Sequence, residues 1–325
     1  MRKFATLLLA LIVLGAAQAP VQAEDAYPTR PVKIMIAFPV GGLLDTVSRI
    51  VGERLSSLLG QQFIVEARPG AGGTLATAAV AKSDPDGYTL MMINDNHALN
   101  PSVFKNIPYD SVKDFAPIGF VGSTPLILVA NSALPMHSVK DLIDAAKQKP
   151  GTITYGSVGV GSAPHLASVM LESVAQIQWQ HVPYRGGAPA LNDLLAGHVN
   201  TMFMSPVTSR QHIQSNKLTA LAVAAPKRLE LFPDVPTMAE AGYPIEASYW
   251  FGLVGPAGMP PAVLAKLEKA LAEVLAMPDV RKRLADMGAI VSLVSPLNGR
   301  QFGDYIRAEI NKWAGIVSKA GVKPE

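Results

Sequence analysis

The chain repeats one local pattern, in which an apolar run of strand type is followed by paired glycines and then by a run of helix type. Residues 38–45 read FPVGGLLD, residues 67–74 read ARPGAGGT, and a third glycine-rich turn, YGSVGVGS, covers residues 155–162. Glycine lets the backbone approach a ligand closely, and the first turn of the following helix leaves amide N–H groups without intrahelical partners. With the helix dipole, these amides favour a carboxylate or a phosphate. The pattern therefore predicts sites for a small anion built mainly from backbone atoms.

Strand-type and helix-type segments alternate along most of the chain. Strand-type runs include VKIMIAF (32–38), FIVEA (63–67), YTLMMI (88–93) and LILVA (126–130). Apolar residues from Leu44 to Leu58 recur at spacings of three and four and end at Gly60, which predicts an amphipathic helix. The alternation predicts parallel sheets with helices on both faces. Ligands bind beyond the carboxyl ends of the strands in such sheets, and the three glycine turns are expected there.

Three later helices are marked by their first residues or by an apolar stripe. Ser138, with Asp141 three residues later, has the spacing of a capping box. Pro260 and Pro261 introduce a long helix, and the apolar residues from Phe302 to Val317 predict a last one.

The N-terminal residues have the pattern of a secretory signal. Arg2 and Lys3 precede an uncharged apolar stretch, and the small residue Ala23 stands just before EDAYP. We expect export with cleavage after Ala23, so that residues 1–23 are removed, because the stretch is short for a membrane span, which needs ~20 residues. A retained membrane anchor is the alternative interpretation.

Composition limits the classes of function. The chain has no cysteine, which excludes a lipid anchor on cysteine, disulfides, thiolate metal sites and a cysteine nucleophile. Of its 28 lysine and arginine residues, two lie in the signal segment, so the remainder nearly balance the 25 acidic residues. Nucleic-acid binding is therefore not expected, and we interpret the short basic cluster at residues 281–283 as solvated.

The 325-residue chain is long enough to bury a large core and to divide into two domains. We place one lobe at residues 24–125 plus 251–325 and the other at residues 126–250, with the chain crossing near 126–130 and 249–256. The turns at 39–45 and 70–74 would then line one wall of a cleft, and the turn at 156–162 the other.

Many ordered motifs along the chain resemble those of one family. They are YPTRPVKIMIAFPVGGLLD, VEARPGAGGT, DPDGYTL, NPSVF with IPYD, DFAPIG, YGSVGVGSAPHLA, HVPYRGGAPALNDLLAGHV, PDVPTMAEAGYP, WFGLVGPAG and KWAGIVSKAG. Over nearly its whole mature length the chain resembles the Bug or TctC family, periplasmic solute-binding receptors of tripartite tricarboxylate transporters. The resemblance implies a type II periplasmic binding protein fold, in which two α/β lobes joined by crossing strands close on a small carboxylated solute. It also implies a periplasmic location, membrane permease subunits as partners, a monomer, and no cofactor, metal or catalytic residue.

The resemblance also implies which residues bind the ligand. Family members hold the ligand carboxylate with amides of the first glycine loop, the second glycine turn and the serine-rich helix start of the opposite lobe. Carried over by motif, the implied positions are Val40, Gly41, Gly42, Ala71, Gly72, Ser157, Ser162 and His165. To these we add residues that flank the same turns and strand ends, namely Phe38, Asp45, Asn94, Asp95 and Met204.

The chain departs from the family pattern at three places. Met204 stands where many relatives have an acid after Met-Phe, and Asp95 stands where relatives tend to have a small polar residue. Leu43 and Leu44 are bulkier than the residues that are common there. These changes favour a pocket with one apolar wall over an ordinary amino-acid ligand.

Several of these residues also have ordinary structural interpretations. An acid such as Asp45 at a helix start is stabilised by the dipole, and Asp95 fits a turn at a strand end as well as a contact to a ligand amine or hydroxyl. His165 suits a helix start after Ser162 as well as a ligand contact. Arg185 in VPYRGG offers a bidentate partner for a carboxylate, with a solvated or lobe-bridging arginine as the alternative.

Three functions remain open from the sequence. The first is a non-catalytic receptor that closes on its solute and delivers it to a membrane permease. The second is an extracytoplasmic sensor that reports the same solute to a signalling partner. The third, a hydrolase, has less support, because the sequence has no HExxH, GxSxG or phosphate-loop motif and provides no orienting acid for Ser162 and His165.

Overall fold

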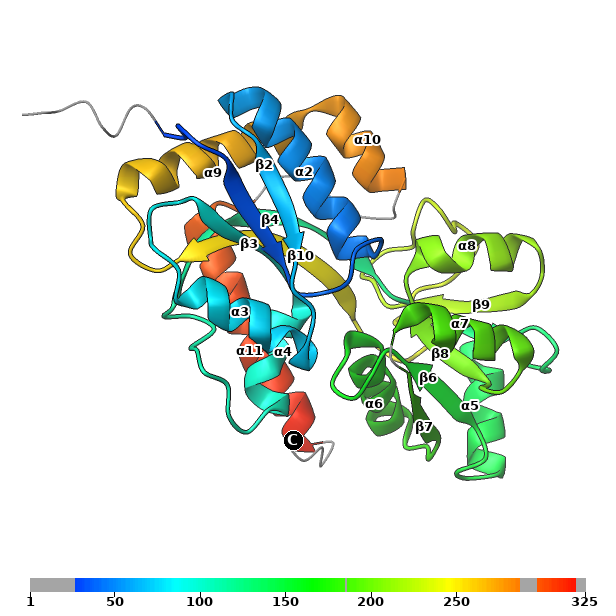
Figure 1. The fold of residues 1–325 in the computed structure, drawn as a ribbon. Coiled ribbons are helices and arrows are strands. Elements are labelled where there is room, and N and C mark those ends of the chain that lie inside the picture. Colours follow the sequence, from blue (N-terminus) through cyan, green and yellow to red (C-terminus); the bar gives the residue numbers. More distant parts are fainter. Residues whose placement is uncertain (1–26, 185, 287–296, 320–325) are drawn as a thin grey trace, which may run out of the picture.

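The computed structural model describes residues 27–184, 186–286 and 297–319, and these residues form two lobes (Figure 1). Each lobe is built on a five-stranded sheet, with strand order β2-β1-β3-β10-β4 in the first lobe and β7-β6-β8-β5-β9 in the second. None of the helices formed by these residues is long and apolar enough to cross a membrane. The signal segment predicted at residues 1–23 lies outside the described residues.

The first sheet is buried on both faces at its centre. Its strands are β1 (Val32–Ile36), β2 (Phe63–Ala67), β3 (Thr89–Asn94), β4 (Phe115–Pro125) and β10 (Ser248–Pro256). Side chains of β3 alternate between two apolar clusters, so that Leu90 and Met92 pack on one face and Met91 and Ile93 on the other. Burial on both faces explains why β3 reads as a continuous apolar run.

Helices cover the two faces of this sheet in separate groups. The helices α2 (Leu43–Leu59), α9 (Pro261–Ala276) and α10 (Pro278–Asp286) share one apolar cluster with the sheet. The helices α3 (Thr74–Ala81), α4 (Asp95–Val103) and α11 (Gly299–Lys319) share the other. Helix α2 ends, as predicted, before Gly60, which has the left-handed φ of 73° that glycine adopts readily.

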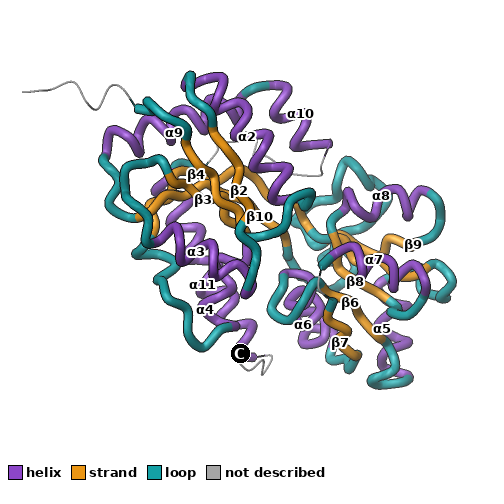
Figure 2. The backbone as a smooth tube through the Cα atoms, viewed as in Figure 1, coloured by secondary structure: helices purple, strands orange, loops and turns teal. Residues whose placement is uncertain are grey.

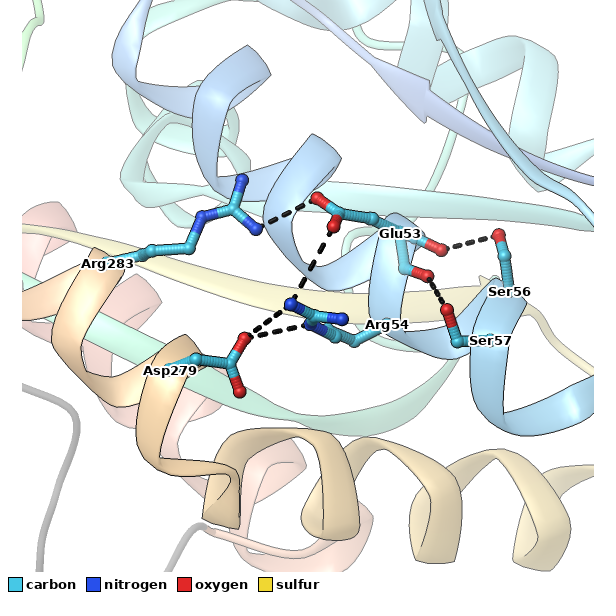
Figure 3. Close-up of polar contacts among 7 residues, drawn as sticks. Glu53, Arg54, Ser56, Ser57, Asp279 and Arg283 are labelled. Carbon is cyan, nitrogen blue, oxygen red and sulfur yellow. Dashed lines mark hydrogen bonds and ion pairs between the residues drawn. The ribbon is translucent and has the colours of Figure 1, made fainter.

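Ion pairs join α2 to α10 (Figure 3). Arg283 Nη1 donates to Glu53 Oε2 at 2.8 Å, and Arg54 Nη2 lies 2.7 Å from Asp279 Oδ2. The basic cluster at 281–283, which we interpreted as solvated, is at least partly exposed, and it also has partners: Glu53 of α2 beside Arg283 and Asp286 at 2.8 Å from Lys282. The four side chains that join α2 to α10 are between 33% and 51% exposed, so each pair contributes little to stability.

The second lobe repeats the same layered arrangement. Its strands are β5 (Ile127–Asn131), β6 (Thr154–Ser157), β7 (Gln180–Pro183), β8 (Thr201–Met204) and β9 (Leu218–Val223). Its helices are α5 (Val139–Gln148), α6 (Ala163–Ala175), α7 (Gly187–Ala196) and α8 (Pro206–Gln214). Two apolar clusters again lie on the two faces of the sheet.

Both sheets are mixed, whereas the alternation of segments predicted parallel sheets. The strands β1, β2 and β3 are parallel, as are β6, β7 and β8. Strand β10, however, runs antiparallel to β3 and β4, and β5 runs antiparallel to β8 and β9. The reason is the crossing between lobes: the chain passes from β4 into β5 and returns to the first sheet along β10, in the opposite direction. The exact lobe boundaries at 125/126 and 250/251 stay a prediction.

Helix α4 differs from one of the two interpretations of Asp95, a turn at a strand end, because Asp95 is its first residue. The segment contains Asn, His and Pro101, all of which are weak or poor helix formers. Its helical form is stabilised by tertiary packing, since Ala98 and Leu99 are fully buried in the cluster shared with α3 and α11.

The two lobes also pack on each other beside the crossing strands. Leu166 of α6, in the second lobe, is fully buried in the apolar cluster of α3, α4 and α11 in the first lobe. Figure 2 shows α6 on the side of the second lobe that faces α4 and α11, and residues of α6 and α11 are in contact.

Candidate functional site

Six helices begin at the carboxyl end of a parallel strand. In the first lobe, α2 follows β1, α4 follows β3, and α3 follows β2 through the short 3-10 turn η1 (Ala71–Gly73). In the second lobe, α6 follows β6, α7 follows β7, and α8 follows β8. No N-cap side chain at these six starts accepts a hydrogen bond from the helix. The N-cap residues are Gly42, Gly73, Asn94, Ser162, Gly186 and Ser205. The first-turn amides of these helices therefore remain available as donors.

Helix α5 provides a contrast at the opposite edge of its sheet. It follows β5, which is antiparallel to β8, so it starts away from α6, α7 and α8. There Ser138 Oγ accepts the amide of Asp141 at 3.1 Å, which confirms the predicted cap. Free amide donors are thus gathered at the strand ends that carry the glycine turns, where they favour an anion.

The second and third glycine turns belong to different lobes and meet on the same helix end. A Cβ placed on Gly72 would lie 2.8 Å from the ring of Phe104, and a Cβ placed on Gly161 would lie 2.8 Å from Val103 Cγ1. Val103 is the last residue of α4 and Phe104 is its C-cap. The end of α4 therefore brings the two turns together, and both positions require glycine for steric reasons as well as for their positive φ.

The first glycine loop, residues 39–42, is closed by an acid from the helix that follows it. Asp45 Oδ2 accepts the amide of Gly41 at 2.9 Å, and Asp45 Oδ1 lies 2.9 Å from Arg49 Nη2. The hydrogen bond from Arg49 is the main cause that lowers the pKa of Asp45; burial opposes it, and the Gly41 bond adds a smaller lowering effect. The contacts of Asp45 are thus internal to the loop, and the Gly41 amide is already occupied. Gly42 leads into the uncapped start of α2.

The second glycine turn is held by side chains of two helices. Asn100 Nδ2 of α4 donates to Gly72 O at 3.1 Å, and Thr77 Oγ1 of α3 donates to Gly73 O at 2.9 Å. Ala71 has a positive φ of 45°, which is uncommon for a residue with a Cβ. A Cβ on Gly73 would lie 3.0 Å from Ala37, just after β1, so this turn also rests against the first loop.

The third glycine turn, residues 158–162, is organised by hydroxyl and imidazole groups. Ser162 Oγ donates to Gly159 O at 2.7 Å, and His165 Nδ1 accepts the amide of Gly161 at 3.0 Å. Ser157, at the end of β6, is fully buried and its Oγ lies 2.6 Å from His181 Nε2. The predicted residues Ser157, Ser162 and His165 therefore come together at one turn, although Ser162 and His165 bond to backbone and not to each other.

Exposed apolar side chains are concentrated on these same turns. Val40 in the first loop is 66% exposed, Leu75 just after the second turn is 52% exposed, and Val160 in the third turn is 48% exposed. Among the described residues, the other large apolar side chains that are exposed are Ile64 and Val174. The apolar surface near the donors therefore comes from the turns.

Two of the predicted site residues, Asp95 and Met204, are buried away from the glycine turns. Asp95 is fully buried, and burial raises the pKa of its carboxyl to about 8. Met204 is 4% exposed and packs in an apolar cluster of the second lobe. Leu44, which we expected to contribute an apolar wall, is likewise buried. All three side chains are packed inside the protein, and a contact between any of them and a solute stays a prediction.

The remaining predicted residues lie near the turns with less direct contacts. Phe38 is partly buried between the two clusters of the first lobe, and Asn94 Nδ2 donates to Asn96 Oδ1 at 3.2 Å. Arg185 lies outside the described residues. The roles of His181 and Asn100 were not predicted, because they depend on contacts between separate elements. No spacing in the sequence indicates those contacts.

The sequence matches one family over most of its length. Residues 47–322 match the tripartite tricarboxylate transporter family receptor, TctC. Protein BugT of Bordetella pertussis is 37% identical over 324 residues, which cover 98% of this chain and 98% of BugT.

Solved structures share the fold, and two of them contain a carboxylate. R. palustris Rpa4515 with adipate has a TM-score of 0.83 and 30% identity, covering 92% of this chain and 100% of that chain. MatC from Rhodopseudomonas palustris with bound malate has a TM-score of 0.80 and 31% identity, covering 90% and 100%. The predicted two-lobed periplasmic binding protein fold is therefore confirmed. By sequence and by fold, this chain belongs to the tripartite tricarboxylate transporter receptor family of periplasmic solute-binding proteins.

Proposed function

We propose that this protein is a periplasmic receptor that captures a small dicarboxylate between its two lobes and delivers it to the permease of a tripartite tricarboxylate transporter. The observation that carries the proposal is that the glycine turns leading into the uncapped starts of α3 and α6, one from each lobe, meet at the end of α4. Backbone amides at helix starts bind an anion without a charged side chain. Carboxylates bound to relatives of the same fold, adipate in one and malate in another, support this choice of anion.

The remaining parts of the proposal rest on the sequence and on the family. We infer that the chain is exported and cleaved after Ala23, which mass measurement of the protein from a periplasmic fraction tests directly. Mature protein beginning at Glu24 supports the inference, and a full-length membrane-bound chain contradicts it. We also infer a monomer in solution, which light scattering tests.

Two alternative functions have different expected partners. A sensor would bind the same solute but copurify with a signalling protein, whereas a transport receptor stimulates solute uptake by vesicles that contain the permease. A hydrolase would use Ser157 and His181, which lie 2.6 Å apart. Ser157 is fully buried, however, and no acid partner orients His181 among the described residues. A triad needs that acid and an accessible nucleophile.

The test is a thermal-shift and calorimetric screen with adipate, malate, a tricarboxylate, acidic amino acids and aromatic acids. A ligand at 100 times its Kd adds about 2.7 kcal/mol to stability, so a binder is readily detected. Gly42→Val should abolish the shift, because the added side chain projects at the start of α2. The substitution is compatible with the fold, since Gly42 has no positive φ and its nearest neighbour would be Pro39 O at 3.6 Å.

Gly315→Val in α11 is the matched control, because Gly315 is exposed and a Cβ there meets nothing within 4 Å. Binding lost in both variants would indicate general damage. Binding kept in Gly42→Val, or no shift with any carboxylate, would contradict the proposed site.

A further inference from the structure

Two stacked histidine rings contact the third glycine turn from its own lobe. The ring centroids of His165 on α6 and His181 on β7 are 4.1 Å apart, with planes inclined by 22°. His165 Nδ1 accepts the amide of Gly161 at 3.0 Å. His181 Nε2 lies 2.6 Å from Ser157 Oγ, which is 3.2 Å from Gly159 N and 3.0 Å from Gly159 O. One ring therefore holds Gly161 directly, and the other holds Gly159 through a serine.

The bond between His165 and Gly161 has only one possible direction. A backbone N–H always donates, so Nδ1 of His165 must carry a lone pair and the ring proton must be on Nε2. A second proton on the ring would go to Nδ1 and would face the Gly161 N–H, which has no freedom to turn away. The bond to Gly161 therefore exists only while His165 is neutral.

The bond between His181 and Ser157 is reversible in direction. Gly159 O already accepts Ser162 Oγ at 2.7 Å and Ser162 N at 3.2 Å, so the Ser157 hydroxyl is free to donate to His181 Nε2. If Nε2 gains a proton, the hydroxyl rotates and accepts instead. Protonation of His181 is thus compatible with the turn, whereas protonation of His165 is not.

The surroundings keep both rings neutral near pH 7. His165 is 5% exposed; burial, and then the neighbouring His181, lower its pKa to about 4. Burial also lowers the pKa of His181 to about 4. The other titratable groups around the pair are Tyr155 on β6, whose ring stacks on His181 at 5.0 Å, and Glu172 on α6, which acts electrostatically on Tyr155. Neither makes a hydrogen bond to an imidazole among the described contacts.

The turn that the pair holds is a wall of the proposed cleft. It carries the exposed Val160, rests on Val103 of the other lobe through Gly161, and leads into the uncapped start of α6. Building on the carboxylate-binding function proposed above, we propose that His165 is a positioning residue whose neutral ring holds this turn in the conformation that binds the carboxylate, and that acid releases the turn. His165 itself need not touch the ligand.

Two substitutions of His165 separate the acceptor from the ring. His165→Asn places an amide oxygen near the position of Nδ1 and cannot titrate, whereas His165→Phe keeps the ring volume without an acceptor. The first readout is hydrogen exchange at the Gly161 amide, measured by NMR without ligand. We expect exchange in His165→Phe to be about tenfold faster than in the wild type, the equivalent of one hydrogen bond, and exchange in His165→Asn to be close to the wild type.

The second readout is the affinity for adipate between pH 7 and pH 4, with far-ultraviolet spectra to confirm that each protein stays folded. At pH 7 we expect His165→Phe to bind about tenfold more weakly than the wild type. Adipate is itself protonated in acid, but this affects all proteins equally. The affinity of the wild type should therefore fall more steeply with acid than that of His165→Asn. His137→Phe, an exposed histidine of the same lobe, is the control and should match the wild type in both readouts.

The outcomes distinguish this inference from the proposed function. Equal Gly161 exchange in all four proteins, or parallel pH profiles of the wild type and His165→Asn, would overturn the positioning role even if adipate binds. Absence of adipate binding to the wild type would instead count against the proposed ligand, and the exchange data would still decide whether His165 holds the turn.

Discussion

Gly161 of the second lobe lies directly on Val103 of the first, so closely that a Cβ on Gly161 would be 2.8 Å from Val103 Cγ1. The contact joins a glycine turn to the end of α4, and it is part of the surface on which the two lobes pack. It provides a direct test of the geometry of the site.

Gly161→Ala should destabilise the protein more than Gly151→Ala. The two glycines have nearly the same φ, 75° and 74°, so the backbone strain of an added Cβ is shared, at roughly 1–2 kcal/mol. Only Gly161 also meets a neighbour, because a Cβ on Gly151 has nothing within 4 Å. We expect overpacking to lower the free energy of unfolding of Gly161→Ala by about 1–3 kcal/mol more, as measured by urea unfolding. An equal decrease in the free energy of unfolding in the two variants would show that Gly161 is not in tight contact with Val103.

Exposed valines of the turns should contribute to affinity for a solute with a hydrocarbon chain. Val40→Ser and Val160→Ser remove methyl groups from the proposed cleft, at about 0.8 kcal/mol for each buried carbon, so we expect adipate to bind about three- to tenfold more weakly. Val174→Ser is the matched control, because Val174 and Val160 are both 48% exposed but Val174 lies in the last turn of α6. The measurement is calorimetry at pH 7. Equal affinity in Val160→Ser and Val174→Ser would contradict an apolar contact at this turn.

Asp95→Asn should stabilise the protein in mild alkali. Burial raises the pKa of Asp95 from its ordinary 3.8 to about 8, so between these values the folded protein holds a proton that the unfolded chain has lost. The contribution of Asp95 to stability is therefore fully present below pH 3.8 and is lost as the pH rises to about 8. We expect the free energy of unfolding of Asp95→Asn, relative to that of the wild type, to rise by on the order of 2–5 kcal/mol between pH 4 and pH 8.

The measurement is urea unfolding of both proteins across that pH range. Asp84→Asn is the control, because Asp84 is exposed and the substitution removes the same charge at the surface. A constant difference in stability between Asp95→Asn and the wild type at every pH would show that Asp95 does not titrate in the way proposed.

His97→Gln should remove part of the sensitivity of the fold to acid. His97 is 3% exposed, its Nε2 donates to Ser111 O at 2.8 Å, and burial lowers its pKa from 6.5 to about 4. Between these values the unfolded chain binds the extra proton, so the stability due to neutral His97 is present above pH 6.5 and is lost as the pH falls to about 4. Glutamine can donate the same bond and does not titrate.

Between pH 7 and pH 4 we therefore expect the free energy of unfolding of the wild type to fall by about 3 kcal/mol more than that of His97→Gln. Thermal and urea unfolding at several pH values measure the difference. If the two proteins lose stability in parallel, the acid sensitivity of this fold has another source.

Features that depend on neighbouring residues were predictable from the sequence. The end of α2 at Gly60, the Ser138 cap of α5 and the glycine turns after β1, β2 and β6 all follow from interactions within a few residues. The two-lobed fold and the receptor family also followed, because the ordered motifs of the family run along the chain.

Features that depend on which elements meet were decided only by the tertiary structure. The burial of Asp95 and Met204, the helical form of α4 and the antiparallel course of β10 result from packing between distant segments. The stacking of His165 on His181 likewise needs α6 and β7 side by side. Local spacing constrains the backbone over a turn or two, whereas burial, protonation and side-chain partners depend on surfaces that exist only once the sheets and helices have assembled.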